Sequence, residues 1–145
     1  MRRVGDLEQI EAVVYGYAER IDAGDFDGVV AMFAHATWRS GATGETYTEP
    51  AAVRAVYDRI ALYPDGTPRT KHLITNLVVD IAEDRRSATG RCSFTVLQTV
   101  EPGEPLSVVV AGRYEDRYER GPGGWRFADR LFVGERTGEQ DRHFR

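Results

Sequence analysis

The amino-acid sequence predicts an α+β domain in which helices precede a curved antiparallel sheet. Apolar residues recur at helical spacing within the first 60 residues. From residue 70 onward, four segments rich in Val, Ile, Thr, Phe and Tyr are separated by polar or Gly/Pro-rich turns. Helices at one end of the chain and antiparallel strands at the other are typical of a sheet that packs one face against helices.

The first helix is expected over about residues 7–23, where apolar side chains recur along one face. Asp6 precedes this stretch and Gln9 follows three residues later, which resembles an N-cap with its reciprocal partner. Gly24 then supplies a stop and Asp25 a new N-cap, so a second, short helix follows at once. The two helices should therefore form a tight corner.

Two further elements are expected before the four strands. Residues 37–40 are short and β-prone, and residues 50–60 place apolar side chains on one helical face with Thr48 as the N-cap. The strands themselves are longer than the usual run of roughly 5–6 residues, so the sheet must bend. Their expected bounds are 71–82, 87–100, 106–120 and 124–134.

A length of 145 residues fits a single domain, with its core at about residues 6–136 and a C-terminal tail at 137–145. Lys and Arg number 19 against 23 Asp and Glu, which gives a net charge of −4. This balance removes the electrostatic reason to expect nucleic acid or an anionic membrane as a partner. The expected partner is a small hydrophobic molecule.

The cysteine and histidine content argues against a metal centre. Cys92 is the single cysteine, and the three histidines lack the spacing of a zinc site, so no metal is expected. His35 lies in a loop and His143 in the polar tail, and neither is assigned a role. The N-terminal stretch has no apolar signal core and no window is long enough to span a bilayer, so we expect a cytoplasmic protein without membrane association.

The first long strand carries the residue best suited to chemistry. Strand alternation places His72, Ile74, Asn76 and Val78 on one face. Imidazole titrates near neutral pH, so His72 is a candidate general base, and Asp22 at the end of the first helix is the best carboxylate to orient it. The alternatives are a hydrogen-bonded core or rim histidine, and an aspartate that only forms the turn.

Other polar and aromatic residues extend this candidate site. Arg130 lies between apolar neighbours on the last strand, so a guanidinium buried there must pair with a ligand oxyanion or with a carboxylate, either Asp22 or Asp116. Tyr17 shares the apolar face of the first helix. The same space could be lined by Trp38, Tyr57 and Tyr114. Each of these aromatic side chains is more typical of a core than of a cofactor site.

Short motifs distributed along the chain match the pattern of one known family. They are Tyr-x-x-x-x-Asp-x-x-Asp from Tyr17 to Asp25, Ala36-Thr37-Trp38, Thr70-Lys71-His72-Leu73-Ile74-Thr75-Asn76, Gly112-Arg113-Tyr114 and Gly124-Trp125-Arg126-Phe127. Over about residues 6–136 the chain resembles the SnoaL-like branch of the nuclear transport factor two superfamily. The resemblance implies a cone-shaped roll, in which a strongly curved antiparallel sheet wraps around the N-terminal helices and encloses an apolar pocket.

Within this superfamily the spacing most resembles scytalone dehydratase and hexachlorocyclohexane dehydrochlorinase, two cofactor-free lyases that use a histidine oriented by an aspartate. The resemblance therefore implies that no cofactor is needed. The resemblance puts their aspartate at Asp22, their histidine at His72 and the arginine of the dehydrochlorinase at Arg130. Tyr17 stands where the dehydrochlorinase has a lysine, and the second histidine of scytalone dehydratase falls near Leu97. The substrate is therefore expected to differ from both.

These observations lead to one functional hypothesis and two alternatives. In the hypothesis, His72 held by Asp22 abstracts a proton from carbon in a small hydrophobic substrate, and elimination or isomerisation follows. Arg130 would stabilise the developing anion and Tyr17 could donate a proton. The pocket would be shaped by Trp38, Tyr57, Asn76 and Tyr114. The alternatives are a non-catalytic ligand-binding protein or subunit of the same fold, and a polyketide cyclase-like protein or cofactor-free oxygenase.

The sheet also predicts self-association. Val108 and Val110, or their alternates Val109 and Ala111, place more apolar surface on its outer face than is usually left in water. We therefore expect a homodimer or a homotrimer.

Overall fold

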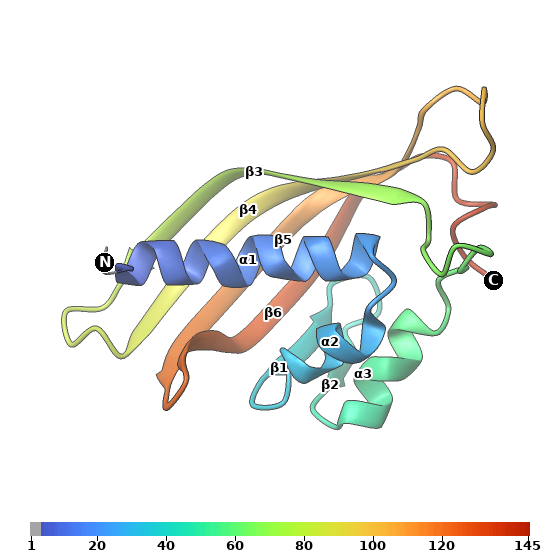
Figure 1. Cartoon of the computed structure of the whole chain (residues 1–145). Coiled ribbons are helices and arrows are strands. Elements are labelled where there is room, and N and C mark those ends of the chain that lie inside the picture. The colour runs from blue at the N-terminus through green and yellow to red at the C-terminus, as the bar shows by residue number, and fades with distance from the viewer. Residues whose placement is uncertain (1–3) are drawn as a thin grey trace.

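A long helix lies across one face of a curved sheet in the computed structural model (Figure 1), which describes residues 4–145. The helices are α1 (Asp6–Asp22), α2 (Phe26–Ala31) and α3 (Pro50–Tyr57). The strands are β1 (Thr37–Ser40), β2 (Thr46–Tyr47), β3 (Thr70–Ile81), β4 (Ser87–Gln98), β5 (Ser107–Gly121) and β6 (Gly124–Thr137). The predicted α+β class is confirmed, and the bounds of the four long strands lie close to those expected.

The six strands form one sheet in the order β2-β1-β6-β5-β4-β3. Strands β3 to β6 make the predicted antiparallel meander, and Figure 1 shows them bending behind α1. Strand β1 instead runs parallel to β6, with Trp38 opposite Arg130. The sequence pattern does not predict β2, which pairs with β1, because two residues are too few to show an alternation.

The corner between α1 and α2 forms as predicted from its glycine and aspartate. Gly24 has a φ of +75°, and a Cβ there would lie 2.1 Å from the carbonyl oxygen of Gly66, so only glycine fits. The next residue, Asp25, caps α2: its carboxylate accepts a hydrogen bond from the backbone N–H of Gly28 at 2.9 Å. The corner therefore packs against the loop that precedes β3, which brings the C-terminal end of α1 close to the start of that strand.

The two other predicted caps are wrong. The N-cap of α1 is Gly5, and Asp6 lies inside the helix, where its carboxylate binds Arg85 and Arg120 instead of a helix N–H. The N-cap of α3 is Glu49 rather than Thr48, without a side-chain hydrogen bond to the helix. Long-range arginine partners therefore outcompete the local cap at α1, and Pro50 alone marks the start of α3.

A β-bulge in β3 overturns the predicted alternation along that strand. The register with β4 shifts between Thr75 and Val78, and Asn76 has a φ of +56°. An inserted residue moves the following side chains to the opposite face. Leu77 and Val79 therefore pack against the core, whereas Asn76 and Val78 are exposed. The expectation that Asn76 shares a face with His72 is wrong.

The core lies between α1 and the concave face of the sheet and is rich in aromatic rings. Phe33 and Phe127 stack at 5.0 Å between ring centroids, and Phe94 and Tyr114 stack at 4.4 Å. Tyr17 meets Phe33, Tyr114 and Phe127 edge to face. Such pairs contribute more than the area that they bury, so they hold Tyr17 and Tyr114 in fixed orientations.

The outer surface of the sheet also differs from the simple alternation. A register shift near Val96 turns Val110 toward the core, while Val109 is buried and Val108 stays 45% exposed. On the side of β3 opposite to His72, Leu73 and Val78 are exposed. Apolar surface is therefore present on this face, on the predicted Val108 and on Leu73 and Val78 of β3, but not on Val109 or Val110. Among residues 4–145 no helix is long and apolar enough to cross a membrane.

Candidate active site

The carboxylate of Asp22 is bound by three groups at the start of β3. One oxygen, Oδ1, lies 2.6 Å from Nδ1 of His72 and accepts a hydrogen bond from the hydroxyl of Thr70 at 2.8 Å. The other, Oδ2, accepts the backbone N–H of His72 at 2.8 Å. Because a carboxylate accepts and does not donate, Nδ1 carries the proton in this pair. The second ring nitrogen of His72, Nε2, is then the basic one.

The surroundings keep Asp22 charged. Partial burial acts to raise the pKa of its carboxyl, but hydrogen bonds from His72 and Thr70 and the charge of His72 outweigh burial, so the pKa lies below its usual value. The side chains of His72 and Asp22 are 7% and 19% exposed. A charged, largely enclosed carboxylate stabilises an imidazolium that forms beside it.

His72 faces a cavity of about 310 Å³ enclosed by the helices, the sheet and the C-terminal segment. Most of the lining is aromatic or aliphatic. The lining residues are Tyr17, Ile21, Trp38, Ser40, Ala42, Thr43, Val56, Tyr57, Arg59, Ile60, His72, Val96, Val110, Tyr114, Phe132, His143 and Phe144. A volume near 300 Å³ lies at the lower end of the range for ligand pockets, so the space suits a small molecule.

Three of the aromatic residues form a buried chain of hydrogen bonds on the cavity wall. The indole N–H of Trp38 donates to the hydroxyl of Tyr57 at 3.0 Å, and the hydroxyls of Tyr57 and Tyr17 lie 2.8 Å apart. Burial raises the pKa of both tyrosines, that of Tyr57 most strongly, so both hydroxyls stay protonated. The chain therefore offers a neutral hydroxyl donor to a ligand.

Arg130 lies outside the cavity lining. Its side chain is fully buried and donates two hydrogen bonds to the carboxylate of Asp116, each with a nitrogen–oxygen distance of 2.8 Å. The guanidinium carbon lies 3.8 Å from the ring centroid of Tyr114 and 4.5 Å from that of Tyr17. The structure thus shows the salt-bridge alternative, because Asp116 stands directly opposite Arg130 in the β5–β6 register.

The structure brings six of the eight predicted site residues together. His72 and Asp22 form the pair, and the cavity is lined by Tyr17, Trp38, Tyr57 and Tyr114. Arg130 lies behind the aromatic wall, and Asn76 points outward from the bulge. Among residues 4–145 there is no group of three or more His, Cys, Asp or Glu side chains that could hold a metal ion.

Sequence reasoning missed several lining residues, of which Phe132 and His143 carry different signals. Phe132 lies on the last predicted strand between Leu131 and Val133, so the apolar run marks the strand but does not show which side chain points inward. His143 lies in a short polar stretch without periodicity, so its place in the cavity depends on contacts distant in sequence.

Comparisons with known proteins agree with this architecture. The model of the SnoaL-like domain family matches residues 2–131. The search of curated proteins found no match. Among solved structures, ActVI-ORFA from Streptomyces coelicolor superposes with a TM-score of 0.76 at 18% identity, covering 91% of this chain and 98% of that one.

Two structures from Novosphingobium aromaticivorans are similar to the same extent. A candidate scytalone dehydratase gives a TM-score of 0.71 at 19% identity and covers 90% of this chain and 85% of that one. An NTF2-like protein with a cystatin-like fold gives 0.69 at 20% identity, covering 87% and 79%. At these identities the structures establish the fold alone, while the family match spans nearly the whole sequence. The chain belongs to the SnoaL-like family and has the nuclear transport factor two-like fold.

Proposed function

We propose that this protein is a cofactor-independent enzyme in which His72, held by Asp22, removes a proton from carbon in a small hydrophobic substrate. The observation that carries the proposal is the pair itself: Nδ1 of His72 lies 2.6 Å from a charged carboxylate, and the same imidazole lines an apolar cavity. A positioned base of this kind typically contributes roughly 10²–10⁴-fold in rate.

The proton balance of the reaction follows from the tautomer. Nε2 of His72 takes the proton from a carbon next to an electron-withdrawing group, and Asp22 stabilises the imidazolium that forms. In an elimination, the electrons of the C–H bond form a C=C bond as the leaving group departs with its bonding pair. In an isomerisation, the imidazolium returns the proton to a different carbon.

The hydroxyl of Tyr17 is the proposed proton donor to a leaving oxygen or to a developing enolate. It lies on the cavity wall and is hydrogen-bonded to Tyr57. Arg130 contributes through Tyr17, because its positive charge lies 4.5 Å from that ring and opposes the rise in the Tyr17 pKa that burial produces. In this proposal Arg130 is a positioning residue and does not contact the substrate.

The test is a screen for carbon-bound proton chemistry in D₂O. Small β-hydroxy ketones and their unsaturated products are incubated with the protein, and mass spectrometry detects loss of water or gain of deuterium. We expect His72→Ala to lower the rate by roughly 10²–10⁴-fold. Thr75→Ala, an exposed position on the same strand, is the matched control and should keep the rate. Equal rates for His72→Ala and the unaltered protein would refute the base.

A non-catalytic binding protein is the second candidate, favoured by one feature of the same pair. Asp22 also binds the backbone N–H of His72 and the hydroxyl of Thr70, so it ties the end of α1 to the start of β3. A carboxylate with these bonds has a structural role whether or not chemistry occurs. Tight binding of a substrate-like molecule without deuterium exchange or water loss would favour this candidate.

We also propose that the exposed side of the sheet joins copies of the chain into a dimer or trimer. Leu73, Val78 and Val108 are each more than 40% exposed there. Apolar side chains gathered on one face are typical of an interface. Sedimentation equilibrium should give a mass two or three times that of one chain, and a single-chain mass would contradict the proposal.

A further inference from the structure

The last six residues of the chain fold back to form one wall of the cavity. The carbonyl of His143 accepts the backbone N–H of Ala61 at 2.7 Å, and Phe144 forms an isolated β-bridge with Ile60. The backbone N–H of Arg145 donates to the carbonyl of Arg59 at 2.9 Å. His143 and Phe144 both line the cavity. The segment after α3 and the C-terminal segment thus close one side of the site together.

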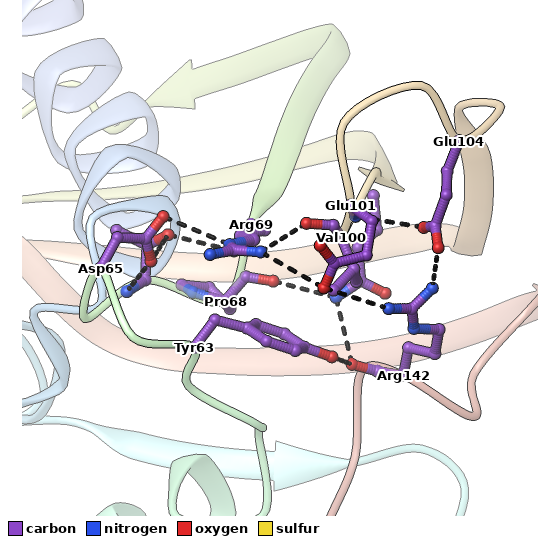
Figure 2. Close-up of polar contacts among 10 residues, drawn as sticks. Tyr63, Asp65, Pro68, Arg69, Val100, Glu101, Glu104 and Arg142 are labelled. Atoms are coloured by element: carbon purple, nitrogen blue, oxygen red, sulfur yellow. Dashed lines mark hydrogen bonds and ion pairs between the residues drawn. The ribbon is translucent and has the colours of Figure 1, made fainter.

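Polar contacts outside the cavity hold this C-terminal segment from two further directions (Figure 2). The hydroxyl of Tyr63 and the side-chain amide of Gln98 both donate to the backbone carbonyl of Arg142. The guanidinium of Arg142 pairs with Glu101 and Glu104 in the loop between β4 and β5. Contacts from three parts of the chain therefore fix the position of this segment, so His143 has a defined place in the cavity wall.

The imidazole of His143 is buried but forms no hydrogen bond with the described part of the protein. The residue is 5% exposed, and its Nδ1 is buried without a hydrogen-bond partner among the described residues. Phe144 packs against the ring edge to face at 4.6 Å between centroids. A buried nitrogen without a partner is unfavourable, and the great majority of buried polar groups are paired. The other ring nitrogen, Nε2, also has no hydrogen-bond partner among the described residues, and it is the nitrogen that a ligand in the cavity can reach, because Nδ1 has no open surface.

His143 also differs from His72 in its electrostatic surroundings. Burial, and then the neighbouring charge of His72, lower the pKa of His143 to about 4. Its imidazole is therefore neutral at physiological pH, with one ring nitrogen that donates and one that accepts. The cavity thus holds one imidazole bound to a carboxylate and one without a protein partner.

We propose that His143 is a second substrate-contacting residue, whose Nε2 hydrogen-bonds to a polar group of the ligand. The ligand class that follows is a compact, mainly apolar molecule with a hydroxyl or carbonyl group at one edge. The hydrogen bond at His143 orients that group while the remainder packs against the aromatic wall. The inference rests on the proposed function in taking this cavity as the substrate site, but it concerns binding and not proton abstraction.

The test compares two probes of the same shape, 2-naphthol and 2-methylnaphthalene, which differ by a hydroxyl in place of a methyl group. His143→Phe keeps an aromatic ring but removes both nitrogens. We expect it to weaken 2-naphthol binding by roughly 3–10-fold, the value of one hydrogen bond, and to leave 2-methylnaphthalene unchanged within about twofold. His143→Gln carries a polar atom near the position of Nε2 and should restore part of the loss.

Two further measurements distinguish loss of the hydrogen bond from loss of the docked C-terminal segment. Hydrogen exchange at the amide of Ala61, which donates to the carbonyl of His143, reports whether the segment remains docked in each variant. In the unaltered protein, the ¹⁵N shift of His143 Nε2 should change on addition of 2-naphthol and stay unchanged with 2-methylnaphthalene. Equal effects of His143→Phe on both probes, an unchanged ¹⁵N shift, or no binding of either probe would overturn the proposal.

Failure of this inference and failure of the proposed function are separable. Proton abstraction is measured by deuterium exchange and depends on His72, whereas the contact at His143 is measured by binding alone. A protein that exchanges deuterium but binds both probes equally after His143→Phe retains the base and loses the second contact. A protein that discriminates between the probes but never exchanges deuterium has the opposite outcome.

Discussion

Two acid–base pairs lie under the helices, and they differ in what surrounds them. Arg130 and Asp116 are both fully buried, with two hydrogen bonds between them and aromatic rings on the guanidinium. Asp116 accepts a further hydrogen bond from Tyr118 at 2.7 Å. His72 and Asp22 are joined by the side chains at 2.6 Å, and His72 lines the cavity. The first pair has no access to a ligand, and the second has.

The difference shows which buried pair is fixed in place and which one can exchange a proton with a ligand. A guanidinium stays charged in proteins and Arg130 is sealed by rings, so its pair is a fixed structural unit. An imidazole gains and loses its proton near neutral pH, so a partner carboxylate beside a cavity allows proton transfer. Burial alone does not distinguish them, whereas contact with the cavity does.

The largest expected effect is on stability, through the sealed pair. Arg130→Met leaves the charge of Asp116 buried without its partner, which typically costs about 3–5 kcal/mol. Urea denaturation should show a loss of this size. The double variant Arg130→Met with Asp116→Leu removes both charges and should recover much of it. A loss below about 1 kcal/mol for the single variant would contradict the structural assignment of this pair.

A smaller stability effect is expected at the cavity pair. His72→Ala removes one hydrogen bond to a charged carboxylate, typically about 1.5–3 kcal/mol, but Asp22 keeps its bond to Thr70 and some contact with water. We expect the lower part of this range in urea denaturation, together with the loss of proton abstraction. If His72→Ala unfolded the protein as severely as Arg130→Met, the contrast between the pairs would fail.

Secondary structure and the corner could be predicted from the sequence because their signals are local. The periodicity of α1, the Gly24–Asp25 corner and the strand-rich second half all depend on neighbouring residues. The pairing of His72 with Asp22 was also accessible, since one residue ends a helix and the other starts a strand in a known family pattern.

Features set by register or by distant contacts could not be predicted in this way. Asn76 leaves the inner face because one inserted residue shifts β3, and no periodic signal marks such a bulge. Arg130 pairs with Asp116 rather than Asp22 because of the β5–β6 register. His143 enters the cavity because the C-terminal segment binds the stretch after α3, which the sequence pattern does not indicate.

Thr70→Val should remove one hydrogen bond to Asp22 while leaving the His72 side chain unchanged. The hydroxyl of Thr70 donates to the same oxygen that meets His72, at 2.8 Å. Its loss typically costs about 0.5–1.5 kcal/mol. Urea denaturation measures the stability loss, and the deuterium-exchange rate should fall far less than in His72→Ala. A rate as low as that of His72→Ala would mean that Thr70, and not the imidazole, is the critical group.

Low pH should reduce the stability that the pair of His72 and Asp22 contributes. The pKa of Asp22 lies below the value of 3.8 that its carboxyl has when unfolded. Its contribution to stability is therefore fully present above pH 3.8 and is lost as the pH falls further, through the folded pKa. Urea midpoints recorded from pH 5 downward should fall less steeply for Asp22→Asn than for the unaltered protein. Parallel slopes would contradict the pairing.

The most direct measurement is the ¹⁵N spectrum of the His72 ring, recorded where the imidazole is neutral. We expect the proton on Nδ1, against the carboxylate of Asp22, and Nε2 as the unprotonated nitrogen. Asp22→Asn should remove this preference while the fold persists. A neutral ring with its proton on Nε2 in the unaltered protein would contradict the claim that Asp22 prepares this imidazole to accept a proton.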